Sequence, residues 1–269
     1  MAGRRARLDA ELVRRGLARS REQAAELVQA GAVLVGGQVA TKPATAVQPS
    51  DPVRVLEASA AASYVSRGAH KLLGALDAFE PAGLRVRGQA CLDAGASTGG
   101  FTEVLLRRGA ASVLAVDVGY GQLAWSLRTD ERVRVLDRTN VRDLTPELVD
   151  GAVDLVVADL SFISLSLVLP ALSGCTRPSA DLLVMVKPQF EVGRERLGRG
   201  GVVRDPALRA SAVVSVGTAG AALGYGTAGV IASPLPGPAG NVEYFLWLAR
   251  SAPPLEVQAV QRAVEEGPQ

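Results

Sequence analysis

Two charged residues follow apolar segments of the kind that form buried strands. Asp159 ends the segment that begins at residue 153, and Lys187 ends the segment 182–187, just before Pro188. The carboxyl ends of parallel strands meet at one edge of a sheet, so we expect Asp159 and Lys187 to lie together at a ligand-binding edge. A lysine in a partly buried site needs a partner, because burial of an unpaired ammonium group is costly. The pair is therefore a candidate for proton transfer or charge stabilisation.

Two further charged residues complete a candidate set of four. Lys71 closes the segment Ser66-Arg-Gly-Ala-His-Lys71, and Glu243 closes the segment Gly240-Asn-Val-Glu243. Surface salt bridges would explain any one of the four residues taken singly. They explain less well why all four occur in this order, each in its own motif.

A glycine-rich turn follows the apolar segment 90–93 and opens a helix. It reads Asp93-Ala-Gly-Ala-Ser-Thr-Gly-Gly-Phe101. The spacing differs from the GxGxxG pattern of dinucleotide-binding proteins, and the chain lacks the Gly-Lys-Ser/Thr of a P-loop. Asp117 ends the next apolar segment, where a carboxylate can accept hydrogen bonds from both ribose hydroxyls of a nucleoside cofactor. A purely structural Rossmann turn is the alternative interpretation.

These residues require a sheet that brings the strand ends together. We expect strands at residues 90–93, 112–117, 133–136, 153–159 and 182–187, with 227–231 and 243–248 closing the sheet. Helical stretches fall between most of them. Continuous apolar strands are typical of a parallel sheet covered on both faces. The pattern predicts an α/β domain over residues 67–269, with a doubly wound, mostly parallel, seven-stranded sheet.

The first 60 residues are predicted to form a separate α+β unit. Residues 7–16 have helical periodicity, and Ser20 with Gln23 forms a capping box for a second helix. Gly36-Gly37 predicts a hairpin turn, and residues 53–55 a further strand. The segment 58–66 is rich in Ala and Ser, so we place a linker at 61–66 between domains 1–60 and 67–269.

Charge is distributed unevenly between these parts. The 269 residues carry a net charge of +2, but residues 1–71 hold 11 Lys/Arg and 6 Asp/Glu, so the rest sums to −3. A basic end on a mildly acidic body indicates a nucleic-acid anchor, with an ordinary solvated basic surface as the even alternative.

Several classes of protein are disfavoured by composition. No apolar run approaches the ~18 residues of a membrane span, and the N-terminus lacks a secretory signal pattern. Cys91, Cys175 and the single His70 are too few and too scattered for a zinc site or a disulfide framework. We therefore expect a cytoplasmic protein with no metal and no membrane association. The sequence leaves the oligomeric state open.

The N-terminal segment resembles the S4 RNA-binding domain over residues 7–24, 31–37 and 42–43. The resemblance implies that the second helix and the adjoining turn present arginines to RNA phosphates. Guanidinium groups suit phosphate oxygens, and such binding weakens with salt. For each residue a simple surface role stays open. The expected RNA-binding residues, with Arg67 added from the segment before Lys71, are Arg4, Arg7, Arg15, Arg19, Arg21, Lys42 and Arg67.

The glycine-rich turn together with Asp117 resembles motif I and the acidic second motif of class I S-adenosylmethionine methyltransferases. This implies a class I Rossmann-like fold and S-adenosylmethionine as cofactor, with Asn140 and Val141 beside its adenine. Phe162 is expected beside the cofactor or a flipped nucleotide, with a core position as the alternative. The expected cofactor-binding residues are Asp93, Gly95, Ser97, Thr98, Gly99, Gly100, Phe101, Asp117, Asn140, Val141, Asp159 and Phe162.

The order Lys71, Asp159, Lys187, Glu243 resembles the tetrad of the FtsJ-like 2'-O-methyltransferases. A ribose 2'-hydroxyl is a poor nucleophile and must lose its proton as it attacks the sulfonium methyl group. The resemblance implies that Lys187 takes that proton or polarises the hydroxyl, and that Lys71 stabilises the developing alkoxide. Asp159 and Glu243 would orient the two ammonium groups.

Across nearly its whole length the chain resembles the TlyA family. The S4-like segment is followed by Tyr64 to Lys71, Leu92 to Phe101, Ala158 to Ile163, Val186 to Glu191 and Gly240 to Glu243. The resemblance implies 2'-O-methylation of cytidine in small- or large-subunit ribosomal RNA, or both. It also implies a link to capreomycin and viomycin sensitivity.

Three alternatives stay open at this point. They are a non-catalytic ribosome-binding or assembly factor, a haemolysin-like membrane-active protein (an older label of the family), and a methyltransferase for a small molecule or a protein. The glycine- and arginine-rich segment 193–201 is expected to be a loop that closes on RNA, or an ordinary exposed loop.

Overall fold

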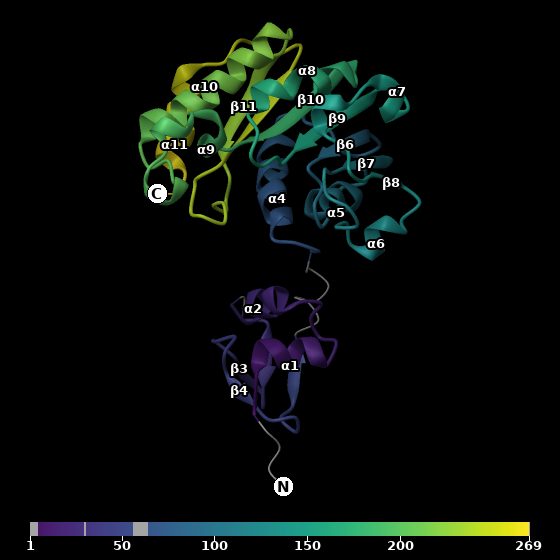
Figure 1. Cartoon of the computed structure of the whole chain (residues 1–269), viewed down its shortest axis with the longest axis vertical. Helices are drawn as coiled ribbons and strands as arrows, with labels where there is room; N and C mark the ends of the chain where they lie inside the picture. Colours follow the sequence, from purple (N-terminus) through teal and green to yellow (C-terminus); the bar gives the residue numbers. More distant parts are fainter. Residues whose placement is uncertain (1–4, 30, 56–63, 269) are drawn as a thin grey trace. The chain divides into compact units, whose positions relative to one another are not determined.

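The computed structural model describes residues 5–29, 31–55 and 64–268. The chain divides into two compact units, Met1–Tyr64 and Val65–Gln269 (Figure 1). The predicted linker at 61–66 begins outside the described residues, so its bounds stay a prediction. Each unit has a hydrophobic core of its own and is described separately below.

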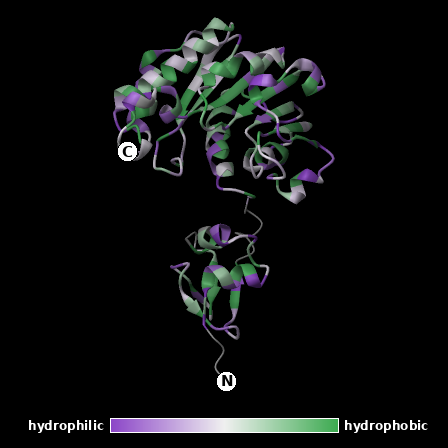
Figure 2. Cartoon of the chain, viewed as in Figure 1, coloured by the Kyte–Doolittle hydropathy of each residue, from purple (hydrophilic) through white to green (hydrophobic). Residues whose placement is uncertain are grey.

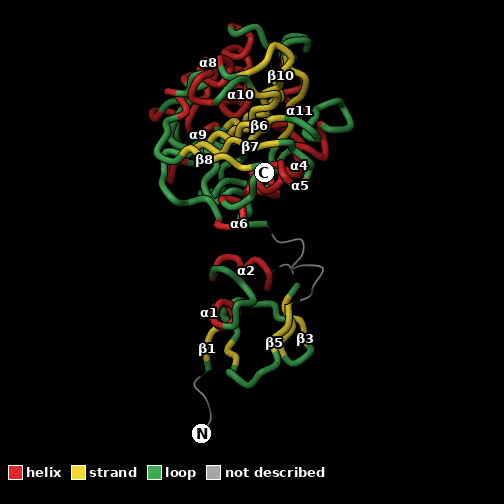
Figure 3. The backbone as a smooth tube through the Cα atoms, turned by 90° about the vertical axis from the view of Figure 1, so that its right-hand side faces the viewer, coloured by secondary structure: helices red, strands yellow, loops and turns green. Residues whose placement is uncertain are grey.

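The smaller unit combines two helices with short strands (Figure 3). Helices α1 and α2 pack against each other, and β2 pairs with both β3 and β5, while β1 pairs with β4. The bounds are β1 (Ala6–Arg7), α1 (Leu8–Arg14), α2 (Arg21–Gln29), β2 (Val33–Val35), β3 (Gln38–Val39), β4 (Ala46–Val47) and β5 (Val53–Val55). Leu8, Leu12, Val28 and Val33 lie at the centre of the core and are essentially inaccessible to solvent.

Local signals explain where these elements start and turn. The hydroxyl of Ser20 accepts a hydrogen bond from the backbone N–H of Gln23 at 3.1 Å, as a helix N-cap does. The side chain of Gln23 accepts one from the backbone of Arg19, so the predicted capping box closes one residue earlier than expected. Gly36 and Gly37 have φ of 58° and 85°, which the predicted hairpin turn requires.

The larger unit is built on one seven-stranded sheet in the order β11-β12-β10-β9-β6-β7-β8. All neighbouring pairs are parallel except those made by β12, which runs antiparallel to both β10 and β11. The predicted doubly wound, mostly parallel sheet is confirmed. The bounds are β6 (Ala90–Ala94), β7 (Ser112–Val116), β8 (Val133–Leu136), β9 (Val153–Ala158), β10 (Thr176–Val186), β11 (Gly226–Ala232) and β12 (Tyr244–Ala249).

Helices cover both faces of this sheet (Figure 1). On one face, Phe79 of α4 packs on Trp247 of β12, and Phe101 of α5 packs on Phe245. On the other face, apolar side chains of α8, α10 and α11 pack against those of β9, β10 and β12. Figure 2 shows the strands between these layers as mainly hydrophobic. The bounds are α4 (Gly68–Phe79), α5 (Gly100–Arg107), α6 (Trp125–Arg128), α7 (Pro146–Val149), α8 (Leu169–Gly174), α9 (Pro188–Glu191), α10 (Pro206–Ala222) and α11 (Val257–Glu266). Within the described ranges, no helix combines the length and apolar character required to cross a bilayer.

The register of β12 determines which residues share the functional edge of the sheet. Tyr244, at the start of β12, pairs with Val186, at the end of β10. The strand was expected to begin at residue 243, but it begins one residue later, so Glu243 lies just beyond the sheet. Because β12 is antiparallel, its first end and the last end of β10 meet, which places Glu243 at the same edge as Lys187.

Candidate active site

The four charged residues expected to act together form two ion pairs. Nζ of Lys71, in the first turn of α4, lies 2.6 Å from Oε2 of Glu243. Nζ of Lys187, directly after β10, lies 2.6 Å from Oδ1 of Asp159, directly after β9. Both lysine side chains are at most 10% exposed, so the fold holds two ammonium groups away from bulk water. Each carboxylate therefore compensates one buried positive charge and orients it.

Ser161 adds a contact that the sequence analysis did not single out. Its hydroxyl oxygen lies 3.0 Å from Nζ of Lys187, which donates the hydrogen bond. The residue was part of the segment Asp159-Leu-Ser-Phe162, but serine carries no charge and gave no signal of its own. Lys187 is thus held from two points of the same loop.

Both lysines reach one small cavity of about 270 Å³. It opens between the first turn of α4 and the glycine-rich turn. Ser66, Arg67 and Gly68 line it on the α4 side, and Asp159 lines it together with Ser161 on the sheet side. A hydroxyl group that entered this cavity would meet both lysines, so the neutral amine of one can accept its proton while the ammonium group of the other stabilises the oxyanion left behind.

A second, larger cavity of about 510 Å³ lies along the ends of β6, β7 and β9. Asp117 lies at its β7 end and accepts backbone hydrogen bonds from Ser97 at 2.8 Å and Gly119 at 2.7 Å. The cavity is polar near Asp117 and Asn140, and apolar around Leu160 and Val168. This combination suits a nucleoside, whose ribose is polar and whose base is flat and apolar on its faces. The residues present therefore fit the predicted cofactor.

The glycine-rich turn approaches the neighbouring strand closely. Gly95 has φ of 88°, and a Cβ atom there would lie 2.4 Å from the carbonyl oxygen of Asp159. Only glycine fits this conformation and this distance. Ser97 also has a left-handed φ of 47°, which points its backbone N–H at Asp117. The turn therefore shapes the boundary between the two cavities.

The residues predicted to bind the cofactor are distributed unequally around these cavities. The larger cavity is lined by Gly95, Ser97, Asp117, Asn140, Val141, Asp159 and Phe162. The smaller one is lined by Gly95, Ser97, Thr98, Gly100, Phe101 and Asp159. Gly99 forms the left-handed N-cap of α5, with φ of 99°, and lines neither cavity. Among the described residues, no cluster of three His, Cys, Asp or Glu side chains is arranged to hold a metal ion.

Asp93 lies beneath the site and does not line either cavity. It is fully buried and accepts a hydrogen bond from the hydroxyl of Thr102 at 2.7 Å. Burial, together with the nearby carboxylates of Asp159 and Asp117, raises the pKa of Asp93 to about 7. Its predicted direct contact with the cofactor stays a prediction.

This raised pKa leads to an expected dependence of stability on pH. The folded state retains a proton on Asp93 that the unfolded chain releases above about pH 4, so the wild type loses stability as the pH rises towards 7. Asp93→Asn removes the titration. We expect its stability relative to wild type to increase by about 2 to 3 kcal/mol between pH 5 and pH 8. Urea unfolding at the two pH values measures this, and an unchanged difference would contradict it.

Phe162 occupies an exposed position at the mouth of the larger cavity. It is 91% exposed, with φ of 65°, and its ring packs against Phe190 at 5.2 Å between centroids. The core alternative for this residue is wrong.

Asn140 accepts a hydrogen bond from the backbone of Arg142, and this contact holds the short turn that carries Val141 into the cavity.

The residues expected to contact RNA differ in how free their side chains are. Arg19, Lys42 and Arg67 are exposed. Arg7 and Arg21 share the carboxylate of Asp9, but their side chains are still 54% and 60% exposed. Arg4 lies outside the described residues.

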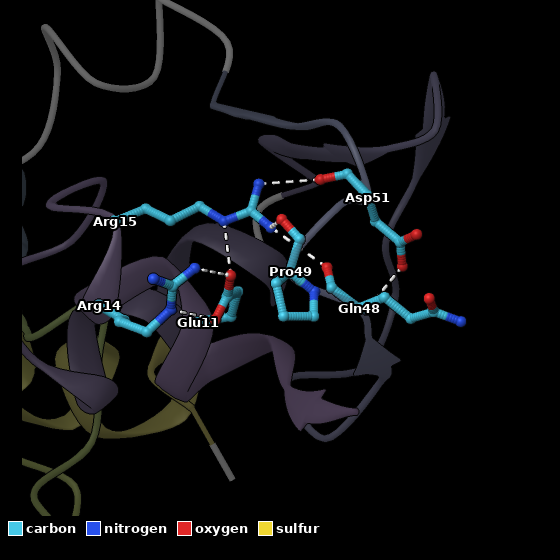
Figure 4. A network of polar contacts seen from close by, with 6 residues as sticks. All are labelled: Glu11, Arg14, Arg15, Gln48, Pro49 and Asp51. Atoms are coloured by element: carbon cyan, nitrogen blue, oxygen red, sulfur yellow. Dashed lines mark hydrogen bonds and ion pairs between the residues drawn. The ribbon is translucent and has the colours of Figure 1, made fainter. Parts of the chain in front are cut away.

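Arg15 has a different environment (Figure 4). Its guanidinium group donates hydrogen bonds to Glu11 and to the backbone carbonyls of Gln48, Pro49 and Asp51. Its side chain is only 19% exposed. The geometry supports a structural role for Arg15, connecting α1 to the segment before β5, rather than the expected phosphate contact.

Arg15→Ala is therefore expected to loosen the smaller unit. Hydrogen bonds from a charged donor contribute about 1.5 to 3 kcal/mol each, so amide hydrogen exchange in residues 47–53 should accelerate at least about tenfold. Arg54→Ala, at an exposed position of β5, is the matched control and should leave exchange unchanged. If exchange in Arg15→Ala is unchanged and RNA binding is weaker, the structural role is contradicted and the expected phosphate contact is supported.

Comparison with known proteins agrees with this geometry. Residues 64–250 match the model of the FtsJ-like methyltransferase family, and residues 6–53 match the S4 domain. Over 98% of its length the chain is 64% identical to the 16S/23S rRNA (cytidine-2'-O)-methyltransferase TlyA of Mycobacterium tuberculosis, of which it covers 99%.

Two other relatives carry a different name. The chain is 35% identical to Hemolysin A of Brachyspira hyodysenteriae, with 88% of this chain and 97% of the relative aligned. A solved structure named "Putative hemolysin from Streptococcus thermophilus" superposes with a TM-score of 0.73 at 35% identity, covering 98% of this chain and 96% of that one.

Proposed function

Because the chain belongs to the FtsJ-like methyltransferase family, in its TlyA branch, we propose that it transfers a methyl group from S-adenosylmethionine to the 2'-hydroxyl of a cytidine in ribosomal RNA. The observation that carries the proposal is the pair of buried lysines, each with its own carboxylate, around one small cavity beside a nucleoside-sized one.

The proposed mechanism uses the two lysines differently. Lys187 lines the smaller cavity, where its neutral amine takes the proton of the 2'-hydroxyl, or its ammonium group polarises that hydroxyl as the oxygen attacks. Lys71, fixed by Glu243, stabilises the alkoxide that develops. Asp159 and Ser161 keep Nζ of Lys187 directed at the cavity. The positioning matters because attack on a methyl group must be in line.

The larger cavity would hold the cofactor, which supplies the electrophilic sulfonium methyl group. Asp117 would accept hydrogen bonds from the two ribose hydroxyls, and Asn140 with Val141 would lie beside the adenine. The close turn at Gly95 leaves space for the methionine part to reach the smaller cavity, which Gly95 and Ser97 also line.

The RNA is proposed to be held by the S4 domain through phosphate contacts. Arg7, Arg19, Arg21 and Lys42 have exposed side chains suited to this, and binding should weaken as salt rises. We further propose that the target nucleotide is extruded from its helix, since a ribose in a duplex does not reach a recessed lysine. Phe162 offers an exposed aromatic face at the cavity mouth for the extruded nucleotide.

The proposal is tested by methyl transfer from labelled S-adenosylmethionine to 30S and 50S subunits that lack the modification. Label in ribosomal RNA of one or both subunits supports it and identifies the subunit. Absence of label on both, with cofactor binding intact, favours the alternative of a non-catalytic ribosome-binding factor. Activity retained after removal of residues 1–60 would favour a small-molecule or protein substrate.

Two further expectations have their own readouts. A 2-aminopurine placed at the target should change in fluorescence on binding if the nucleotide is extruded, and unchanged fluorescence would contradict extrusion. Cells that lose the enzyme should change in their sensitivity to capreomycin and viomycin. Lysis of red cells by the pure protein without S-adenosylmethionine would instead favour the membrane-active alternative.

A further inference from the structure

The loop after β9, residues 159–164, forms one wall of the larger cavity and is connected to the segment after β10 at three points. At its start, Asp159 and Ser161 both contact Nζ of Lys187, at 2.6 and 3.0 Å. In its middle, the ring of Phe162 packs on that of Phe190. The third connection involves a residue that has no part in the mechanism described above.

Glu191 makes this third connection. Its Oε2 accepts a hydrogen bond from the hydroxyl of Ser164 at 2.6 Å, and its Oε1 accepts one from the backbone N–H of Leu165 at 2.8 Å. The hydroxyl oxygen of Ser164 also accepts a hydrogen bond from the backbone of Ser166, which starts the short helical turn Leu165–Leu167. Both oxygens of one half-buried carboxylate thus hold the far end of the loop.

The loop needs such support because its conformation is strained. Phe162 is a bulky residue with a left-handed φ of 65°, and its side chain is almost fully exposed apart from its contact with Phe190. A strained backbone persists where its flanks are fixed. Lys187 fixes the flank that begins at Asp159, and Glu191 fixes the flank that ends at Ser164.

We propose that Glu191 is a positioning residue for methyl transfer. Its two hydrogen bonds set the place of the loop, and thereby of Leu160, Ser161 and Ile163 in the wall of the larger cavity. They also keep the hydroxyl of Ser161 within reach of Nζ of Lys187. The inference rests on the function proposed above for this site. It implies that Glu191 acts on cofactor affinity and on the rate of transfer, and leaves RNA capture by the S4 domain unaffected.

Comparison of Glu191→Ala with Glu191→Gln shows whether the site requires the hydrogen bonds of this side chain or its negative charge. Glutamine keeps the length of the side chain, accepts the hydrogen bond from Leu165 with its oxygen and donates one to the hydroxyl of Ser164. Glu131→Ala is the matched control, since that glutamate is exposed, lies just before β8 and lines neither cavity.

Two measurements on the full chain are needed, namely calorimetric binding of S-adenosylmethionine and the kcat and KM of methyl transfer to ribosomal RNA. Glu191→Ala should bind the cofactor roughly tenfold more weakly and lower kcat roughly 10- to 100-fold, the scale of a small misplacement of reacting groups. Its KM for RNA should stay within about twofold of wild type, because the S4 domain supplies the phosphate contacts. Glu191→Gln and Glu131→Ala should behave as wild type.

Three results would overturn the proposal. Wild-type affinity and kcat in Glu191→Ala would do so, including the case in which only its melting temperature falls. A defect in Glu191→Gln as large as that in Glu191→Ala would show that charge, and not hydrogen bonding, is what the site requires. If Glu191→Ala does not fold, Ser164→Ala removes one of the same contacts from the loop side, and wild-type cofactor affinity there would count against the proposal.

The calorimetric measurement keeps this inference separate from the proposed function. It needs no RNA, so the effect of Glu191 on the cavity is measured even if the wild type fails to methylate ribosomal RNA. Absence of transfer by the wild type contradicts the substrate assignment, whereas unchanged cofactor binding in the variant contradicts the positioning role.

Discussion

Lys187→Ala is expected to lower the rate of methyl transfer by about 10²- to 10⁴-fold, the usual contribution of a general base. The variant removes the amino group of Lys187 from the small cavity and leaves the 2'-hydroxyl without its proton acceptor. Its fold should be retained, because the partner Asp159 is 24% exposed and water can reach the unpaired carboxylate. Single-turnover transfer from labelled S-adenosylmethionine measures the rate, with cofactor binding expected to stay intact.

Lys187→Arg is the informative companion of this variant. Arginine retains a positive charge and an ion pair with Asp159, but its guanidinium group does not give up a proton at neutral pH. We expect Lys187→Arg to bind the cofactor and to be nearly as slow as Lys187→Ala. Substantial activity in the arginine variant would mean that the site requires only a positive charge, and the role of proton acceptor would have to be withdrawn.

Asp117→Ala is expected to weaken binding of S-adenosylmethionine by about 100-fold. Hydrogen bonds to a charged group contribute about 1.5 to 3 kcal/mol each, and the loss of one or two of them corresponds to this factor. The variant also leaves the backbone N–H groups of Ser97 and Gly119 without their acceptor, which loosens the turn beside the cavity. Calorimetry of cofactor binding measures the effect.

Asp130→Ala is the control for this variant. Asp130 precedes β8 and its carboxylate is hydrogen-bonded to Arg132, without lining either cavity. It should bind the cofactor as wild type does. Wild-type affinity in Asp117→Ala would contradict the assignment of the larger cavity to the nucleoside part of the cofactor.

The sequence predicted part of the site because two of its four charged residues directly follow strands. Asp159 and Lys187 close uninterrupted apolar segments, and the order of parallel strands then brings them together whatever the details of packing. Glu243 was harder to place from periodicity. Its position depends on β12 being antiparallel and on its register with β10, which long-range pairing decides.

Residues that act through uncharged or backbone contacts were not predicted. Ser161 contacts Lys187 through one hydrogen bond, and the role proposed for Glu191 depends on two, and no spacing rule identifies either residue. For Arg15, in contrast, the sequence predicts a role that the geometry does not support. Its sequence context resembles that of an RNA-binding arginine, but the fold turns its guanidinium group towards three carbonyls of its own unit.

The burial of Asp93 is another feature that could not be predicted from the sequence. The motif resemblance predicts a cofactor contact for this residue, and in the folded chain its carboxylate is fully buried and hydrogen-bonded to Thr102. The sequence indicates which strand ends carry polar residues, and the packed structure decides how deeply each of them is buried.

The most direct test of the account is the identity of the modified nucleoside. Subunits incubated with the enzyme and labelled S-adenosylmethionine would be digested completely, and the nucleosides identified by mass. We predict label in 2'-O-methylcytidine, at a ribose whose 3' linkage resists alkali, and no such label with Lys187→Ala. Label on a base, on a protein, or on a ribose to the same extent with Lys187→Ala would contradict the central claim that this lysine serves 2'-O-methylation.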